Sequence, residues 1–288
     1  MIAIELKKLT LEKDVHGIES ALNNLMADNL QTDADFTETF LELLMQNTPS
    51  INLVVTKTIA EITKHPEQRS KFSNNEVLEK LIELLGINKN LELTIQLCRA
   101  LGNIFYSNDD ARNIVFHLDG GKTLVDLFNI SDIEINEHEL FAKIRSGVVS
   151  NYLLGNEELS QKAIELGIIE KMKLRMEESS GGLEHLLPLF SILTEQVSDL
   201  IFNPEVLTLI TKNLKTSTNP EIIESSLELL MCQSESDDVK LLLAKEGLCE
   251  HIFKSLASYK NLVGEEVEAK NLVKLGCDLI VLILTGGK

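Results

Sequence analysis

The chain runs QLCRALGNIFYSN from Gln96 to Asn108, and the spacing of apolar residues in this stretch predicts a helix. Leu97, Leu101 and Ile104 follow the three-and-four spacing of a helix, and most residues between them are apolar as well. A helix that is apolar on nearly all sides is buried between neighbours. Polar side chains recur along one edge only, at spacings of three, four and three: Gln96, Arg99, Asn103 and Tyr106. We expect a central helix with one polar edge that faces a partner.

The pattern around this helix repeats along the chain. The positions equivalent to Asn103 are Ala60, Asn151, Thr194 and Met231, and the middle helices recur with a similar irregular step. The steps lie close to the roughly 40 to 47 residues of HEAT and armadillo repeats, and a short first helix in each unit favours armadillo. Since one repeat cannot bury its apolar faces alone, stacked repeats share a continuous core. The sequence therefore predicts an all-α fold, a right-handed α-solenoid of armadillo-type repeats with about six units.

We expect a single solenoid over residues 1–288, with an opening helix at 9–29. The expected repeats cover residues 34–66, 67–108, 109–156, 157–199, 200–236 and 237–288. The last helix, from Glu266 to Leu284, is as apolar as an interior one, whereas the end of a solenoid needs a polar outer face. Either the chain is a fragment cut at a repeat boundary or another subunit covers this end, and we favour the fragment.

Charge and composition narrow the classes of partner. The chain has 27 Lys and Arg against 45 Asp and Glu, which gives a net charge of −18. A nucleic-acid-binding protein needs a surplus of basic residues, so the charge argues against this class. The most apolar stretch, Val273–Leu284, is too short to span a bilayer, and the N-terminal stretch MIAIELKKLTLEKD lacks the apolar run of a signal peptide. Four cysteines without a CxxC pair indicate neither a zinc site nor a disulfide framework. We expect a cytoplasmic protein, with a nuclear location as the alternative, that neither binds nucleic acid nor inserts into a membrane.

Catalytic and cofactor motifs are not found in the sequence. The six histidines lack the i, i+4 partner of a helical metal site. Gly120-Gly121 has no phosphate-loop companions and, in register with Gly167 and Gly247, is interpreted as a turn between two helices. No Ser lies in a GxSxG elbow. We predict a protein that is not an enzyme, with no metal and no cofactor.

Two features predict binding. Asn103 and Asn151 share one register of successive third helices, where a side-chain amide can hold a partner's backbone; two chance asparagines are the alternative. Acidic residues gather at repeat edges and again around the final helix. These acids are either solvated loops or a groove that attracts a Lys- and Arg-rich tail, more strongly at low salt.

Several short blocks resemble one family. Arg99–Tyr106, RALGNIFY, resembles the RALGNICY segment of SmgGDS, the armadillo-type guanine-nucleotide dissociation stimulators of small GTPases. Ile59–Lys64, IAEITK, is similar to the family's IAEVAK. Val239–Leu248 and Gly276–Leu284 are similar to its IKLQLVEAGL and GSDLMVLLL blocks. The blocks are collinear over roughly residues 9–284 and resemble the first half of the family.

The resemblance implies binding of Rho-, Rap- and Ras-type GTPases through polybasic, prenylated C-terminal tails. Such proteins act as chaperones that shelter the lipid, and they stimulate GDP release. The implied tail-binding acids are the three that open the final helix and the Asp that matches the family's block: Glu265, Glu266, Glu268 and Asp278. Val267 and Ala269 stand where the family carries acids. The expected groove-facing residues are Arg99, Asn103, Tyr106 and Asn151.

Two other binding classes compete with this hypothesis. An importin-like adaptor for basic peptides would also carry an acidic groove, but it typically flanks the basic side chains with Trp. Trp is absent from the sequence, which counts strongly against an adaptor of this kind. A general protein-interaction scaffold is the third hypothesis.

Overall fold

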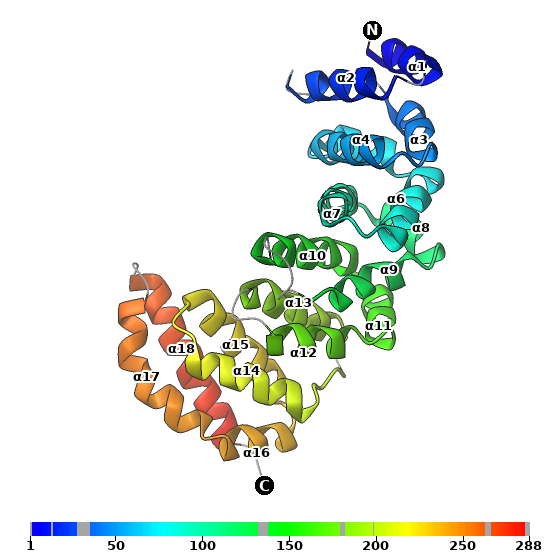
Figure 1. The fold of residues 1–288 in the computed structure, drawn as a ribbon. Coiled ribbons are helices and arrows are strands. Elements are labelled where there is room, and N and C mark those ends of the chain that lie inside the picture. The colour runs from blue at the N-terminus through cyan, green and yellow to red at the C-terminus, as the bar shows by residue number, and fades with distance from the viewer. Residues whose placement is uncertain are drawn as a thin grey trace. The chain divides into compact units, whose positions relative to one another are not determined.

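The computed structural model of the chain describes residues 2–12, 14–27, 35–131, 138–178, 182–197, 199–262 and 266–285. All regular elements in these ranges are helices, as the sequence predicts (Figure 1). The chain divides into two compact units. Unit 1 consists of Met1–Ile130 and Lys143–Leu154, and unit 2 consists of Ser131–Ala142 and Gly155–Lys288.

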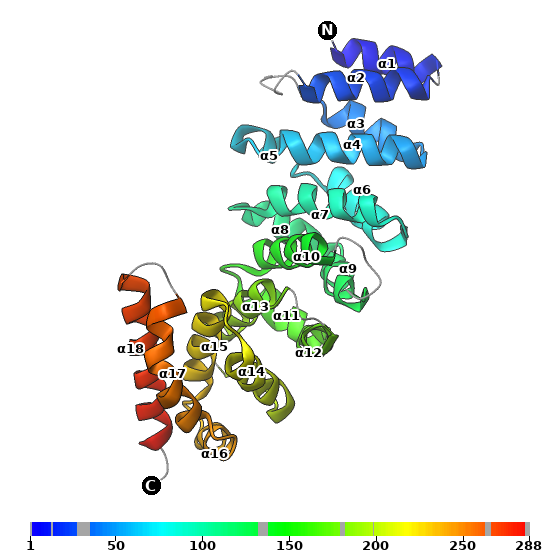
Figure 2. The same ribbon diagram turned by 60° about the vertical axis from the view of Figure 1, so that its left-hand side comes forward.

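Unit 1 holds the helices up to the second half of α10. They are α1 (Ile2–Glu12), α2 (Val15–Ala27), α3 (Thr37–Met45), α4 (Pro49–Ile62), α5 (Pro66–Phe72), α6 (Asn75–Ile87), α7 (Leu91–Phe105), α8 (Asp109–His117), α9 (Gly120–Asp126), the 3-10 turn η1 (Leu127–Asn129) and α10 (His138–Leu153). Figures 1 and 2 show α2, α4, α7 and α10 lying one on the next. Along their other side α3, α6 and α8 pack in succession. We call α4, α7 and α10 the third-helix layer of unit 1.

Unit 2 repeats this arrangement with the remaining helices. They are α11 (Glu157–Glu165), α12 (Ile168–Glu178), α13 (Leu183–Gln196), α14 (Pro204–Thr216), α15 (Pro220–Gln233), α16 (Asp237–Lys245), α17 (Leu248–Leu262) and α18 (Glu266–Leu284). Helices α13, α15 and α18 pack in succession and form the third-helix layer of unit 2. Helices α12, α14 and α16 pack in the same order beside them.

Asparagine side chains fix where many of these helices begin. Each accepts a hydrogen bond from a backbone N–H in the first turn, which otherwise has no partner in the helix. The capping residues are Asn74, Asn90, Asn108, Asn156, Asn203 and Asn219. Such a cap stabilises a helix by about 1 kcal/mol. Two expected repeat boundaries, after 108 and after 156, therefore coincide with helix starts.

The N-terminal region differs from the expected opening helix at 9–29. Two helices are found, because α1 ends at Glu12 and α2 begins at Val15. Asp14 separates them: its N–H donates to the Leu9 carbonyl, 3.0 Å, and its carboxylate accepts from the Gly17 N–H, 2.9 Å. An Asp that caps its own following turn favours a new helix start over helix continuation. In the next repeat, Asp35 accepts from the N–H of Thr37, the first residue of α3, at 2.9 Å.

The predicted central helix is confirmed as α7. Leu97, Leu101 and Ile104 are fully buried, whereas Gln96, Arg99 and Asn103 are only partly covered. A Cβ built on Gly102 would lie 3.5 Å from the Val148 Cα, so α7 and α10 approach at ordinary contact distance there. The polar edge of the helix follows from the sequence spacing, and the burial follows from packing between α4 and α10.

The glycine turn is shifted by one residue from its expected place. Before α12 and α17 the left-handed residue is a glycine, Gly167 or Gly247, but before α9 it is Asp119, with φ of 55°. Gly120 is the first residue of α9. A Cβ on Gly120 would lie 2.6 Å from Val115 Cγ1, so close packing is the reason for glycine at this position.

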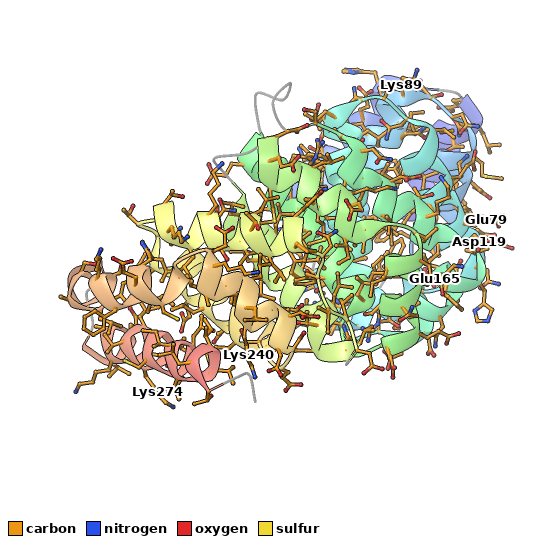
Figure 3. All side chains as sticks on the ribbon, turned by 90° about the horizontal axis from the view of Figure 1, so that it is seen from below. Glu79, Lys89, Asp119, Glu165, Lys240 and Lys274 are labelled. Atoms are coloured by element: carbon orange, nitrogen blue, oxygen red, sulfur yellow. The ribbon has the colours of Figure 1, made fainter. Side chains whose placement is uncertain are left out.

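Charged side chains cover the outside of both units. Figure 3 shows Glu79 and Asp119 pointing outward from unit 1, and Glu165 and Lys274 pointing outward from unit 2. Among the described residues, no three metal-ligating side chains gather at one point. In the same ranges, no helix has the length and apolar character needed to cross a bilayer. All four cysteines are free thiols.

Candidate functional site

Two of the predicted groove residues, Asn103 and Asn151, make the same bond in successive repeats. Asn103 Nδ2 donates to the Ala60 carbonyl of α4 at 2.7 Å, and Asn151 Nδ2 donates to the Gly102 carbonyl of α7 at 3.0 Å. Each amide therefore reaches back from one third helix to the last turn of the preceding one. The shared register predicted from sequence is a hydrogen-bonded ladder across unit 1.

The ladder supplies hydrogen bonds to backbone carbonyls in the last turns of α4 and α7. A helix leaves its last four carbonyls without intrahelical donors. Three of these carbonyls in α7 bond to groups in the following turn, and the fourth, that of Gly102, accepts from Asn151. In α4 the Ala60 carbonyl has the same need, which Asn103 satisfies. One donor of each amide is used within the chain, and contact of these residues with a partner stays a prediction.

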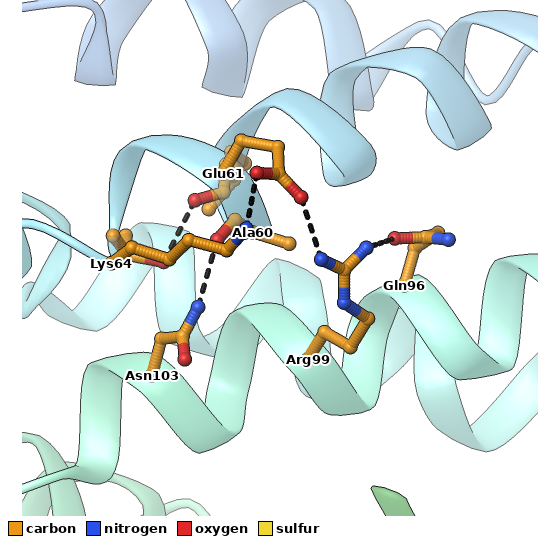
Figure 4. Close-up of polar contacts among 8 residues, drawn as sticks. Ala60, Glu61, Lys64, Gln96, Arg99 and Asn103 are labelled. Atoms are coloured by element: carbon orange, nitrogen blue, oxygen red, sulfur yellow. Dashed lines mark hydrogen bonds and ion pairs between the residues drawn. The ribbon is translucent and has the colours of Figure 1, made fainter. Parts of the chain in front are cut away.

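Arg99 is held beside this ladder by two neighbours. Its guanidinium donates to Glu61 Oε1 of α4 at 2.6 Å and to Gln96 Oε1 at 2.7 Å (Figure 4). The second oxygen of Glu61 accepts from Lys64 Nζ at 2.5 Å. Partial burial acts to raise the pKa of Glu61, but the hydrogen bonds and charges of Lys64 and Arg99 outweigh it and lower the pKa. Glu61 is therefore a firmly ionised carboxylate between two cations.

Tyr106 closes the polar edge of α7 with an exposed ring. Its side chain is 54% exposed, and the Arg69 guanidinium carbon lies 5.0 Å from the ring centroid. Arg69 also donates to the Thr63 and Lys64 carbonyls, each at 3.0 Å. The four predicted groove residues thus all lie in unit 1: Arg99 and Asn103 on α7, Tyr106 directly after it, and Asn151 on α10.

Unit 2 presents carboxylates where unit 1 presents amides and cations. Glu195 lies on α13, and Glu224 and Glu228 lie one turn apart on α15. Burial raises the pKa of Glu228, and the charges of Glu224 and Glu195 raise it further. Charges that raise the pKa of Glu228 in this way lie close to its carboxylate.

Helix α18 extends this surface with two of the predicted tail-binding acids. Asn271 Nδ2 donates to Glu224 Oε1 at 2.5 Å, so this side of α18 meets α15. Glu268 and Asp278 are exposed and lie three residues before and seven after Asn271, which puts them on the same side. Lys274 lies near them and offsets part of the charge. We call Glu195, Glu224, Glu228, Glu268 and Asp278 the acidic face.

The side chains of the other two predicted acids, Glu265 and Glu266, lie outside the part of the chain that the structure describes. Glu265 lies outside the described residues. Glu266 is the first residue of α18, and its side chain is likewise outside what the structure describes. Their part in a tail-binding patch stays a prediction.

A hollow of about 550 Å³ lies where α13 and α15 end. Its wall contains three carboxylates, Glu195, Asp199 and Glu235, and its apolar part contains Leu200 and Ile201. The carboxyl ends of helices carry partial negative charge, which adds to that of the side chains. A Lys or Arg side chain, with an apolar stem and a cationic head, matches this lining.

Replacement of Glu228 by Gln is expected to stabilise the protein slightly at pH 7. Like charges one turn apart on a helix destabilise it by about 0.2–0.5 kcal/mol, and Gln removes that repulsion while keeping the shape. Because the pKa of Glu228 is raised above its ordinary 4.5, the native state binds more protons there, so the gain shrinks as the pH falls toward 4.5. Urea denaturation at pH 7 and pH 4.5 measures the difference, with Glu177→Gln on the exposed end of α12 as the control. Equal effects of both variants at both pH values would contradict the repulsion.

The acids of the third helices were missed by sequence reasoning. The charged stretch at the start of α18 is the more conspicuous signal in the sequence, although Glu224 and Glu228 stand four residues apart on one helical face. A helical-wheel projection of each third helix would have placed these acids on its exposed side. Glu195 lies 29 residues before Glu224 in the sequence, so the proximity of the two side chains follows only from the tertiary structure.

Comparison with known proteins confirms both the fold and the resemblance. The chain is 44% identical over 264 residues to the GTPase-GDP dissociation stimulator vimar of Drosophila melanogaster, a match over 88% of this chain and 41% of vimar. It is 29% identical over 238 residues to Rap1 GTPase-GDP dissociation stimulator 1-B of Xenopus laevis, a match over 81% of this chain and 39% of that protein. The chain thus spans less than half the length of these relatives. No protein-family model matches it.

Solved structures give the fold alone. A designed armadillo repeat protein superposes with a TM-score of 0.64 at 16% identity, over 86% of this chain and 99% of the other. A computationally designed armadillo repeat protein for modular peptide recognition gives 0.67 at 18% identity, over 84% and 99%. The armadillo-type α-solenoid predicted from the repeat period is therefore confirmed.

Proposed function

The chain is a relative of the GTPase-GDP dissociation stimulators, and on that premise we propose that it binds a small GTPase of the Rho, Rap or Ras type. It recognises the polybasic, prenylated C-terminal tail of the GTPase, acts as its chaperone and stimulates release of GDP. The observation that carries tail recognition is the acidic face of unit 2, where the charges of Glu224 and Glu195 add to burial in raising the pKa of Glu228.

The electrostatics of the acidic face fit a basic ligand. Glu195 and Glu228 have no ion-pair partner among the described residues. A cationic tail would relieve their mutual repulsion on binding, which favours the complex over the free protein. The net charge of −18 adds long-range attraction that speeds encounter with a cation.

The proposed exchange activity requires no covalent step. A protein that binds the nucleotide-free GTPase more tightly than the GDP-bound form shifts the equilibrium toward GDP release. Shape and charge suffice for such differential binding. This proposal agrees with the names of the relatives, which describe dissociation stimulators.

The test is a titration of the full chain with a fluorescein-labelled peptide that carries five lysines in a C-terminal GTPase-like tail. Fluorescence anisotropy is recorded at 50 and 300 mM salt, and a peptide with Gln in place of each Lys is the control. We expect the basic peptide to bind, and its affinity to fall about tenfold or more at high salt because the charges are screened beyond about 10 Å at 0.1 M. Equal affinity for the Gln peptide would refute tail recognition.

Exchange is measured separately. A Rho-type GTPase loaded with a fluorescent GDP analogue is mixed with the chain in the presence of excess GTP. Faster release with a basic-tailed GTPase than with its Gln-tailed counterpart is expected. Tail binding without faster release would support recognition and contradict the stimulation of GDP release by this chain.

A further inference from the structure

The third-helix layer of unit 1 carries a strip of cations on an otherwise acidic chain. We call Lys57 of α4, Lys64 in the turn after α4, Arg99 of α7 and Lys143 of α10 the cationic strip. Two carboxylates lie beside them: Glu61, which is bonded to Lys64 and Arg99, and the exposed Glu139, which lies one turn before Lys143 on α10. Lys57 and Lys143 are exposed, and neither has an ion-pair partner within the described ranges. The strip therefore has a local surplus of positive charge.

The cations follow the amide ladder from helix to helix. Lys57 lies three residues before Ala60, and Arg99 lies four before Asn103, so each sits one turn from the ladder. Lys143 lies two turns before Asn151 on the next helix. Packed helices are about 8–10 Å apart, and an extended chain rises about 3.3 Å per residue. An extended segment crossing the layer would thus meet a new helix about every third residue.

The ladder also offers acceptors for a peptide backbone. Because each Nδ2 donates to the preceding helix, the amide planes of Asn103 and Asn151 are held in place. Figure 4 shows the bond of Asn103 to the Ala60 carbonyl. Neither Oδ1 accepts a hydrogen bond from any described residue. A carbonyl-type oxygen fixed in this way can accept from the backbone N–H of a bound chain. Tyr106, half exposed beside Arg69, adds an aromatic face at the end of the row.

We propose that the cationic strip of unit 1 binds an acidic, extended segment of a protein partner. The carboxylates of the segment pair with Lys57, Arg99 and Lys143, and its backbone donates to Asn103 and Asn151. A polypeptide fits better than a nucleic acid. A nucleic acid carries a negative charge on every nucleotide and is repelled by the net charge of −18, whereas a peptide can carry its carboxylates at wider intervals. This inference is independent of the proposed function, since neither a GTPase nor a basic tail takes part in it.

The probe is a fluorescein-labelled peptide of four Glu-Ser-Gly repeats, which places a carboxylate at every third residue. Its binding to the full chain is followed by fluorescence anisotropy at 50 mM salt. A Gln-Ser-Gly peptide and a dodecamer of deoxythymidine serve as comparison ligands. We expect the Glu peptide to bind at least tenfold more tightly than either, because it alone combines carboxylates with a backbone that donates hydrogen bonds.

The matched variants are Lys57→Glu with Lys143→Glu on the strip, and Lys8→Glu with Lys89→Glu away from it. All four lysines are exposed, both pairs change the net charge equally, and Lys89 lies between α6 and α7 (Figure 3). The strip pair is expected to weaken binding about tenfold or more, and the control pair by less than about twofold. Equal loss in both pairs, or equal binding of the Gln peptide or the oligonucleotide, would overturn the proposal. If the Glu pair lowers the Tm, the pair Lys57→Gln with Lys143→Gln replaces it. This pair changes the charge less and is still expected to bind the Glu peptide more weakly than the control pair.

Discussion

Exchange of Glu195 and Glu228 for lysine is expected to weaken binding of a basic tail by about 30- to 100-fold at 50 mM salt. An exposed charge pair contributes up to about 1 kcal/mol, and reversal replaces that attraction with repulsion of similar size. Two reversed sites thus change the binding free energy by about 2–3 kcal/mol, where 1.4 kcal/mol is a tenfold change. The measurement is the anisotropy titration with the five-lysine peptide.

These two residues leave the rest of the acidic face intact. Glu224 keeps its bond to Asn271, so the contact between α15 and α18 survives the exchange. A lysine at position 228 also stands four residues after Glu224, which is a favourable order on a helix. The variant is therefore expected to fold with an unchanged Tm.

Glu165→Lys with Glu177→Lys is the matched control for tail binding. Both residues are exposed in unit 2, both lie in the last turn of a helix, where a cation is favourable, and the net charge changes by the same amount. Glu268→Lys with Asp278→Lys on α18 should behave like the first pair, because these acids share the acidic face. If the control weakens binding as much as the acidic-face variants do, only the overall charge matters and a local tail site is refuted.

Replacement of Asn103 by Asp is expected to destabilise unit 1 by about 2–3 kcal/mol at pH 7. The change is nearly isosteric, but it removes the donor to the Ala60 carbonyl and puts a carboxylate oxygen against a carbonyl oxygen. An unsatisfied buried acceptor costs about 1–3 kcal/mol, and more when a charge is involved. The midpoint of urea denaturation measures the loss.

The pH dependence of this variant identifies the cause. An Asp with no donor facing it has a pKa raised above the ordinary value of about 3.9, because the protonated form alone can donate to the Ala60 carbonyl. The native state then binds more protons than the unfolded state, so the loss is full at neutral pH and shrinks as the pH falls. Asn113→Asp, on the exposed side of α8, adds the same charge without facing a carbonyl and should cost little. A loss that stays constant between pH 7 and pH 4 would contradict the ladder.

Much of the fold was predictable because its causes are local. Apolar residues three and four apart around Leu97 and Leu101 define α7, and Asn90 and Asn108 mark the start of two helices. The register of Asn103 and Asn151 also follows from counting along the repeats. The opening region was predicted less well, because the single side chain of Asp14 decides between one helix and two.

The candidate site depends on contacts between residues far apart in the chain. Asn103 and Ala60 are 43 residues apart, and Asn271 and Glu224 are 47 apart. The place of Asn103 on the polar edge of a third helix follows from the sequence, because a helical face is set by a period of 3.6 residues. The bond from its amide to the preceding helix, and the common surface of the carboxylates of α13, α15 and α18, follow from the tertiary structure. Such pairings depend on how helices stack, which no local pattern encodes.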